Sequence, residues 1–95
     1  LKPSPDHELA ATITELAGGV GPLLERARVA VEDGDLRLAC HLVDIAAWAA
    51  GDDPGVHRER AAVYRTRRRA ESSLMAKGIF AAAARESEAL LPPED

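Results

Sequence analysis

The fold of this chain is decided by residues 15–54, which read ELAGGVGPLLERARVAVEDGDLRLACHLVDIAAWAAGDDP. Small residues recur in this stretch at helical spacing, and Gly34-Asp35 separates two helical runs. Glycine commonly ends a helix and aspartate caps the start of the next one. Asp52-Asp53-Pro54 closes the second run in the same way. The pattern predicts a packed pair of helices joined by a short turn.

Caps and breaks divide the rest of the chain as well. They predict helices at residues 7–17, 22–32, 36–50, 54–72 and 73–90. The sequence is 46% hydrophobic with alanine dominant, and it has no strand-length alternation, so an all-α bundle of four to five helices is expected. We expect residues 6–91 to form one helical domain between a linker or disordered arm at 1–5 and a disordered tail at 92–95.

The helix at 36–50 is apolar on nearly all sides, which predicts a central, buried position. The predicted core consists of Leu23, Leu24, Ala27, Ala39, Leu42, Val43 and Ala46. The helix at 54–72 is mostly charged and offers a narrow apolar seam through Val56, Ala62 and Val63. Apolar surface should therefore stay open to a second subunit, and the predicted interface consists of Trp48, Leu74, Met75, Ile79, Phe80 and Ala83.

Charge and composition weigh against several classes of partner. Sixteen acidic residues against twelve Lys and Arg give a net charge of −4, which is unlike the basic surface of a nucleic-acid-binding protein. The longest apolar run, 42–50, is too short to cross a bilayer. We expect neither nucleic acid nor a membrane as partner, and a cytoplasmic location is the default. Because the chain begins with Leu1, we expect a fragment of a larger polypeptide.

No group of residues in the sequence indicates catalysis or metal binding. The three histidines, His7, His41 and His57, are widely separated, whereas zinc needs clustered ligands. Cys40 lies within an apolar helix, which favours a role as a small core residue. A basic run contains Arg65, Arg67, Arg68 and Arg69. It is interpreted as a solvated helix end, with a contact to phosphate or to an acidic protein surface as the alternative.

The second and third predicted helices resemble a tetratricopeptide-type hairpin. Small and apolar residues recur on both sides of the Gly34-Asp35 turn, namely Leu23, Ala27, Ala30, Ala39, Val43 and Ala46. This resemblance supports a free-standing adaptor that binds peptides as one candidate function. A helical DNA-binding module is another candidate function, which the acidic composition disfavours.

A second resemblance covers roughly residues 14–87. Glu15-Leu16-Ala17-Gly18-Gly19, then Leu23-Leu24-Glu25-Arg26-Ala27-Arg28, then Gly34-Asp35 and Ala39 look like the helical dimerisation domain of alkyl sulfatase-type proteins. The resemblance implies a homodimer that lies beside a zinc-dependent metallo-β-lactamase-fold catalytic domain of the same polypeptide. It also implies that zinc belongs to that catalytic domain, and that this fragment is no enzyme and holds no cofactor.

Overall fold

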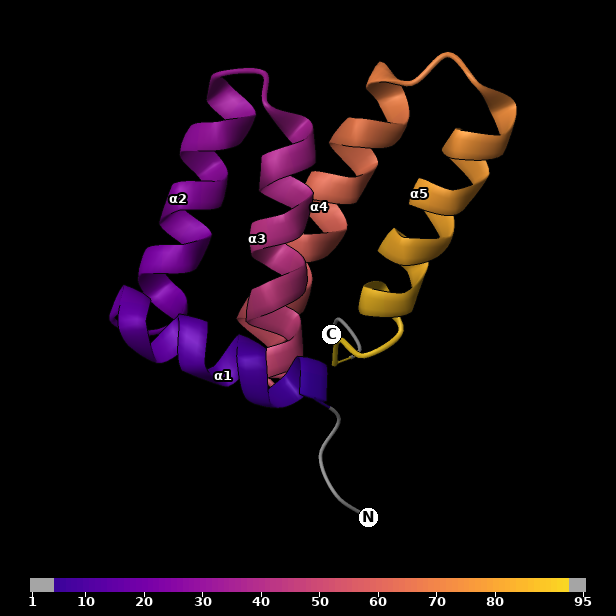
Figure 1. The fold of residues 1–95 in the computed structure, drawn as a ribbon. Coiled ribbons are helices and arrows are strands. Elements are labelled where there is room, and N and C mark those ends of the chain that lie inside the picture. The colour runs from indigo at the N-terminus through magenta and orange to yellow at the C-terminus, as the bar shows by residue number, and fades with distance from the viewer. Residues whose placement is uncertain (1–4, 93–95) are drawn as a thin grey trace.

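A computed structural model describes residues 5–92, which form five helices and no strand (Figure 1). The helices are α1 (Pro5–Ala17), α2 (Val20–Glu32), α3 (Leu36–Ala49), α4 (Pro54–Ala70) and α5 (Leu74–Glu88). The predicted all-α fold is therefore confirmed. No helix in the described region is long and apolar enough to span a membrane.

The boundaries of the domain differ slightly from those expected. Pro5, assigned to the arm from the sequence, is the first residue of α1. Proline fits this position because the first backbone N–H of a helix has no partner within the helix. The remaining predicted arm, residues 1–4, and most of the predicted tail, residues 93–95, lie outside the described residues.

The turn between α2 and α3 follows the expected chemistry. Gly34 has φ +81°, a conformation that residues with a side chain rarely adopt. It lets the amide of Gly34 bond to the carbonyl of Val31 at 3.0 Å, and that of Asp35 to Ala30 at 2.8 Å. The Asp35 side chain then accepts from the amide of Leu38 at 3.1 Å and caps α3. Gly34 thus ends one helix, and Asp35 starts the next.

The helices form two hairpins and one crossing helix (Figure 1). α2 and α3 lie side by side, α4 and α5 form the second hairpin, and α1 runs across the end of the first. α3 contacts α1, α2 and α4, so it occupies the central position that its apolar pattern predicted. Among the described helices, α5 packs closely only against α4.

The core lies between α2, α3 and α4. It contains the predicted residues Leu23, Leu24, Ala27, Ala39, Val43 and Ala46, all buried. Leu42 is the exception, since it is only partly buried and packs against the core from outside. The physical reason is its place on α3, about 100° round the helix from the fully buried Val43. The all-round apolar pattern did not reveal which side of α3 is fully covered.

The fourth helix covers more than the sequence suggested. Its inner face buries Val56, His57, Ala61, Val63 and Tyr64. The prediction that Ala62 belongs to this seam is wrong, because Ala62 is exposed. The expected narrow seam is also wrong, since α4 packs extensively along α5.

Candidate functional site

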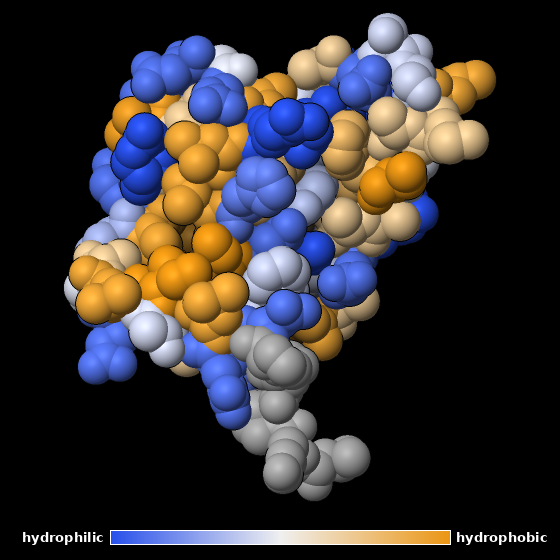
Figure 2. Space-filling model, in the orientation of Figure 1, coloured by the Kyte–Doolittle hydropathy of each residue, from blue (hydrophilic) through white to orange (hydrophobic). Residues whose placement is uncertain are grey.

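Among the described residues, five of the eight large apolar side chains that stay exposed lie on two separate parts of the surface. On α5, Leu74 is 86% exposed, Met75 78% and Ile79 60%. On α1 and α3, Leu9 is 61% and Trp48 51% exposed. Figure 2 shows an apolar area over α1, α2 and α3, which polar residues separate from the apolar atoms of α5. The protein therefore has two candidate contact surfaces.

The first surface is the outer face of α5. The exposed positions on this helix include Leu74, Met75, Gly78, Ile79 and Ala82, which recur at spacings of three and four residues. Such positions share one side of a helix. The opposite side carries Ala81, Ala84 and Ser87, which are buried against α4. From Leu74 to Ala82, α5 is thus apolar on its exposed face as well as on its buried one, and the exposed Arg85 and Glu86 follow on the same side. We call these five exposed residues the outer face of α5.

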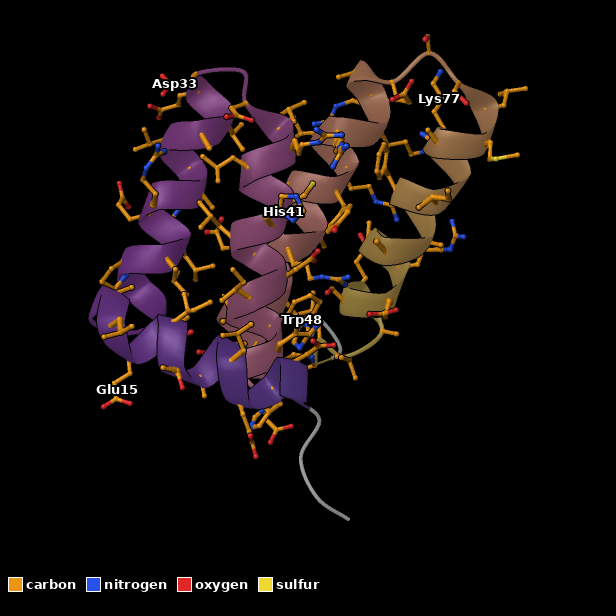
Figure 3. The ribbon with its side chains drawn as sticks, in the orientation of Figure 1. Glu15, Asp33, His41, Trp48 and Lys77 are labelled. Carbon is orange, nitrogen blue, oxygen red and sulfur yellow. The ribbon has the colours of Figure 1, made fainter. Side chains whose placement is uncertain are left out.

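The second surface is a groove between α1 and α3, of about 240 Å³. Its lining is largely apolar and consists of Asp6, Leu9, Ala10, Ile13, His41, Ile45 and Trp48. His41 and Trp48 both lie along α3 (Figure 3). At one end of the groove, His7 Nδ1 donates to the carbonyl oxygen of Trp48 at 2.7 Å. This bond joins the start of α1 to the last turn of α3, where helix carbonyls otherwise have no partner.

The predicted interface residues do not form one surface. Trp48 borders the groove, at the end of α3, while Leu74 and Met75 lie at the start of α5 near Lys77 (Figure 3). Phe80 and Ala83 are partly buried and pack against the core. Two neighbouring side chains cover Phe80. The ring centroids of Tyr64 and Phe80 lie 6.1 Å apart, and the guanidinium carbon of Arg67 lies 4.3 Å from the centroid of the Phe80 ring. Among the predicted interface residues, Leu74, Met75 and Ile79 lie on the outer face of α5.

A largely buried polar network connects α3, α4 and α5, and the sequence did not reveal it. Arg60 Nε donates to Asp44 Oδ1 at 2.9 Å, and the hydroxyl of Tyr64 donates to Asp44 Oδ2 at 2.7 Å. Arg60 Nη1 donates to Ser87 Oγ at 2.8 Å and to the carbonyl of Ala83 at 3.0 Å. Burial, followed by the bond to Asp44, raises the pKa of Tyr64. The one available signal was an aspartate within the apolar run of α3.

His57 and Ser87 complete this network. His57 Nε2 donates to the carbonyl of Gly51 at 2.7 Å, so Nδ1 accepts from Ser87 Oγ at 3.0 Å. A serine beside a histidine can act as a nucleophile when a substrate reaches it. Ser87 is 0% exposed and also accepts from Arg60, so this pair holds α5 against α4.

The histidines and the cysteine form no metal site in the part of the chain that the structure describes. No three His, Cys, Asp or Glu side chains lie together there in a way that could hold a metal ion. The described residues therefore do not fit a zinc site, which needs clustered ligands. Cys40 is buried, and burial raises the pKa of its thiol more than the neighbouring Arg67 lowers it. A thiol of this kind is a poor nucleophile.

The basic run at the end of α4 is largely engaged within the chain. Arg65 Nη2 donates to Glu88 Oε1 at 2.6 Å, and the bond raises the pKa of Arg65. Arg67 covers Phe80, and Arg69 donates to the hydroxyl of Thr66 at 3.2 Å. Arg65 and Arg67 therefore contact α5, and Arg69 bonds within α4.

These features define a class: a small helical bundle whose exposed apolar faces suit protein contacts. Comparison with known families identifies the protein family within this class. The chain belongs to the alkyl sulfatase dimerisation family, whose model matches residues 1–89. The match confirms the resemblance to alkyl sulfatase-type proteins, while the likeness of α2 and α3 to a tetratricopeptide hairpin stays a prediction. No curated protein and no solved structure matches the chain.

Proposed function

We propose that this domain is a non-catalytic, self-associating module of a zinc-dependent metallo-β-lactamase-fold hydrolase. The observation that carries the proposal is the match of residues 1–89 to a family of dimerisation domains. In this proposal two copies meet about a two-fold axis, and the catalytic domain of the same polypeptide is the second partner. Zinc belongs to that catalytic domain.

The exposed apolar surface supports self-association. Leu74 and Met75 are more than three-quarters exposed, which is costly for side chains of this size in a monomer. Contiguous apolar patches of this kind usually mark protein contacts. A two-fold axis lets the same patch on each subunit cover the other and closes the assembly at two.

The test of self-association is the molar mass in solution. Light scattering coupled to gel filtration, at about 100 μM protein, covers dissociation constants up to the micromolar range. We expect a mass near twice the 10.1 kDa of one chain, falling toward one chain on dilution. A mass of one chain at the highest concentration would refute the proposed function.

The test of the proposed parent protein is separate. A longer reading frame that includes this domain should contain a His-x-His-x-Asp-His motif, the ligand cluster of the catalytic fold. The domain alone should retain only substoichiometric zinc after dialysis against a weak chelator. Stoichiometric zinc in elemental analysis would contradict the assignment of zinc to another domain.

A free-standing adaptor is the second candidate, and the groove between α1 and α3 is the observation that favours it. Its apolar lining could accept side chains of a peptide. A domain that is monomeric at about 100 μM and has no catalytic domain in its reading frame would favour the adaptor.

A further inference from the structure

We infer that the two-fold contact is made by the outer face of α5, with Gly78 close to the axis. This inference rests on the proposed self-association and names the surface that performs it. Three features of α5 support it: its attachment to one helix only, a glycine that the chain itself does not require, and a face that is complementary to itself.

The attachment of α5 leaves its outer face open. α5 packs closely against α4 and against no other described helix. The five residues of this face fall within an arc of about 140° at 100° per residue. Leu74, Met75 and Ile79 carry the large side chains of this arc, and all three are at least 60% exposed. A helix of this kind is apolar toward solvent, which is unfavourable unless another surface covers it.

Gly78 is unexplained by contacts within the chain. Glycine is, after proline, the residue least favourable to a helix. Gly78 has no positive φ, and a Cβ built on it would meet nothing within 4 Å. Neither backbone conformation nor packing within one chain therefore requires glycine at this position. A second helix that crosses α5 at close range would require it, because a side chain would hold the two backbones apart.

The outer face is also complementary to itself. In an antiparallel crossing with Gly78 on the axis, Leu74 lies opposite Ala82 of the partner subunit, and Ala82 lies opposite Leu74 of the partner subunit. Large side chains then meet small ones on both sides of the axis, which permits close packing. Gly78 and Ala82 occupy the middle of the arc, and Leu74, Met75 and Ile79 flank them.

Charge at the end of the face agrees with this register. Arg85 is exposed and lies on the same side of α5 as Gly78, seven residues further along. In the antiparallel crossing it reaches the N-terminal end of α5 of the partner subunit, next to the turn that contains Glu71. Backbone amides of Ser73 and Ser72 hold the pKa of Glu71 below its usual range, so Glu71 carries its charge at neutral pH.

The groove between α1 and α3 is a poorer two-fold contact. It is concave, and two concave surfaces placed against each other leave their floors uncovered. A two-fold contact requires a surface that fits itself. The groove therefore serves as the competing surface in the experiment.

Two matched substitutions separate these surfaces. Ile79 and Leu9 are 60% and 61% exposed, so Ile79→Glu and Leu9→Glu place the same charge at equally accessible positions. Sedimentation equilibrium of the full chain should show the dimer dissociation constant rising at least about ten-fold with Ile79→Glu. With Leu9→Glu it should change less than about two-fold. Circular dichroism checks that both variants fold.

A cysteine at the axis gives a positive test. Two cysteines form a disulfide only when their Cα atoms come within about 7 Å, and a residue on a two-fold axis lies near its own mate. Gly78→Cys should therefore give a disulfide-linked dimer rapidly with copper–phenanthroline. Gly21→Cys is the control, since Gly21 is also an exposed helical glycine with open space around it. Cys40 is buried and stays in both proteins.

The outcomes distinguish this inference from the proposed function. A dimer that is weakened by Leu9→Glu as much as by Ile79→Glu would overturn the assignment to α5 while self-association stands. Crosslinking of Gly78→Cys no faster than that of Gly21→Cys would overturn the place of Gly78 at the axis. A wild-type chain that is monomeric at about 100 μM would refute the proposed function itself.

Discussion

Arg60 on α4 forms a salt bridge with Asp44 on α3, with 2.9 Å between Nε and Oδ1. The Arg60 side chain is 12% exposed and that of Asp44 is 19% exposed. The same guanidinium reaches Ser87 Oγ and the carbonyl of Ala83 on α5. One side chain therefore connects three helices. Since α5 packs closely on α4 alone, this arginine acts together with the buried Ala81 and Ala84 to hold the proposed dimer surface in position.

Asp44→Ala should destabilise the domain strongly. The change leaves the Arg60 guanidinium with only the exposed Glu86 carboxylate, 3.4 Å from Nη1, as a counter-charge, and it leaves the Tyr64 hydroxyl without its acceptor. Removing one partner of a largely buried pair costs about 3 kcal/mol. Urea denaturation followed by circular dichroism should show a midpoint that falls accordingly.

The control for this prediction is an exposed ion pair of the same chemistry. Arg28 donates to Glu59 at 2.7 Å between Nη2 and Oε1, on the surface between α2 and α4. Glu59→Gln should lower the midpoint only slightly, because water solvates both groups and screens their attraction. Equal losses in the two variants would show that the Asp44 network adds nothing beyond a surface pair.

Val43→Asp should prevent folding, whereas Leu42→Asp should leave a folded but weakened domain. Val43 is fully buried in α3, so an aspartate there has no partner and no water. Leu42 is partly buried, and an aspartate there can reach solvent. A cost of about 5 kcal/mol or more at position 43 is comparable with the whole stability of a domain of this size. Thermal melting of both variants tests the order, and a reversed order would contradict the burial pattern of α3.

The helices could be predicted from the sequence because residues close to each helix end determine where it begins or stops. The hydrogen bonds of Gly34 and Asp35 join residues no more than five positions apart in the sequence. Asp53 likewise caps α4 by accepting from the amide of Gly55 at 2.8 Å. Signals of this range need no knowledge of the fold. The family resemblance also rests on short segments of sequence, between Glu15 and Ala39.

The details of the surface could not be predicted in the same way. Asp44, Arg60 and Ser87 meet only because three helices pack together, and their spacing in the sequence indicates nothing. Phe80 was expected at an interface, but Tyr64 and Arg67 cover it, which depends on the rotation of α4. A rotation of one residue also decides that Ala61 is buried and Ala62 exposed.

The stability of the domain should fall in alkaline solution. The pKa values of Tyr64 and Cys40 are raised in the folded state above their ordinary 10.0 and 9.0. Above about pH 9 the unfolded chain releases these protons while the folded chain keeps them, so the free energy of unfolding decreases as pH rises. The slope should approach about 1.4 kcal/mol per pH unit for each group.

Tyr64→Phe identifies the tyrosine contribution to this slope. Urea denaturation at several values between pH 8 and about pH 11 should give a flatter profile for the variant than for the wild type. Equal slopes would show that Tyr64 titrates alike in the folded and unfolded chains, and thus that its burial and its bond to Asp44 do not hold in solution.

Gly34→Ala and Gly78→Ala should change stability in opposite directions. At Gly34, φ is +81°, and an alanine forced into this conformation costs about 1 kcal/mol. At Gly78 the backbone is helical and the space around it is open, so alanine should stabilise the monomer by up to about 1 kcal/mol. Urea denaturation is measured at a protein concentration well below the dimer dissociation constant, so that association does not contribute. A loss of stability with Gly78→Ala under these conditions would mean that the chain itself requires this glycine, and the glycine would then no longer support a helix crossing on α5.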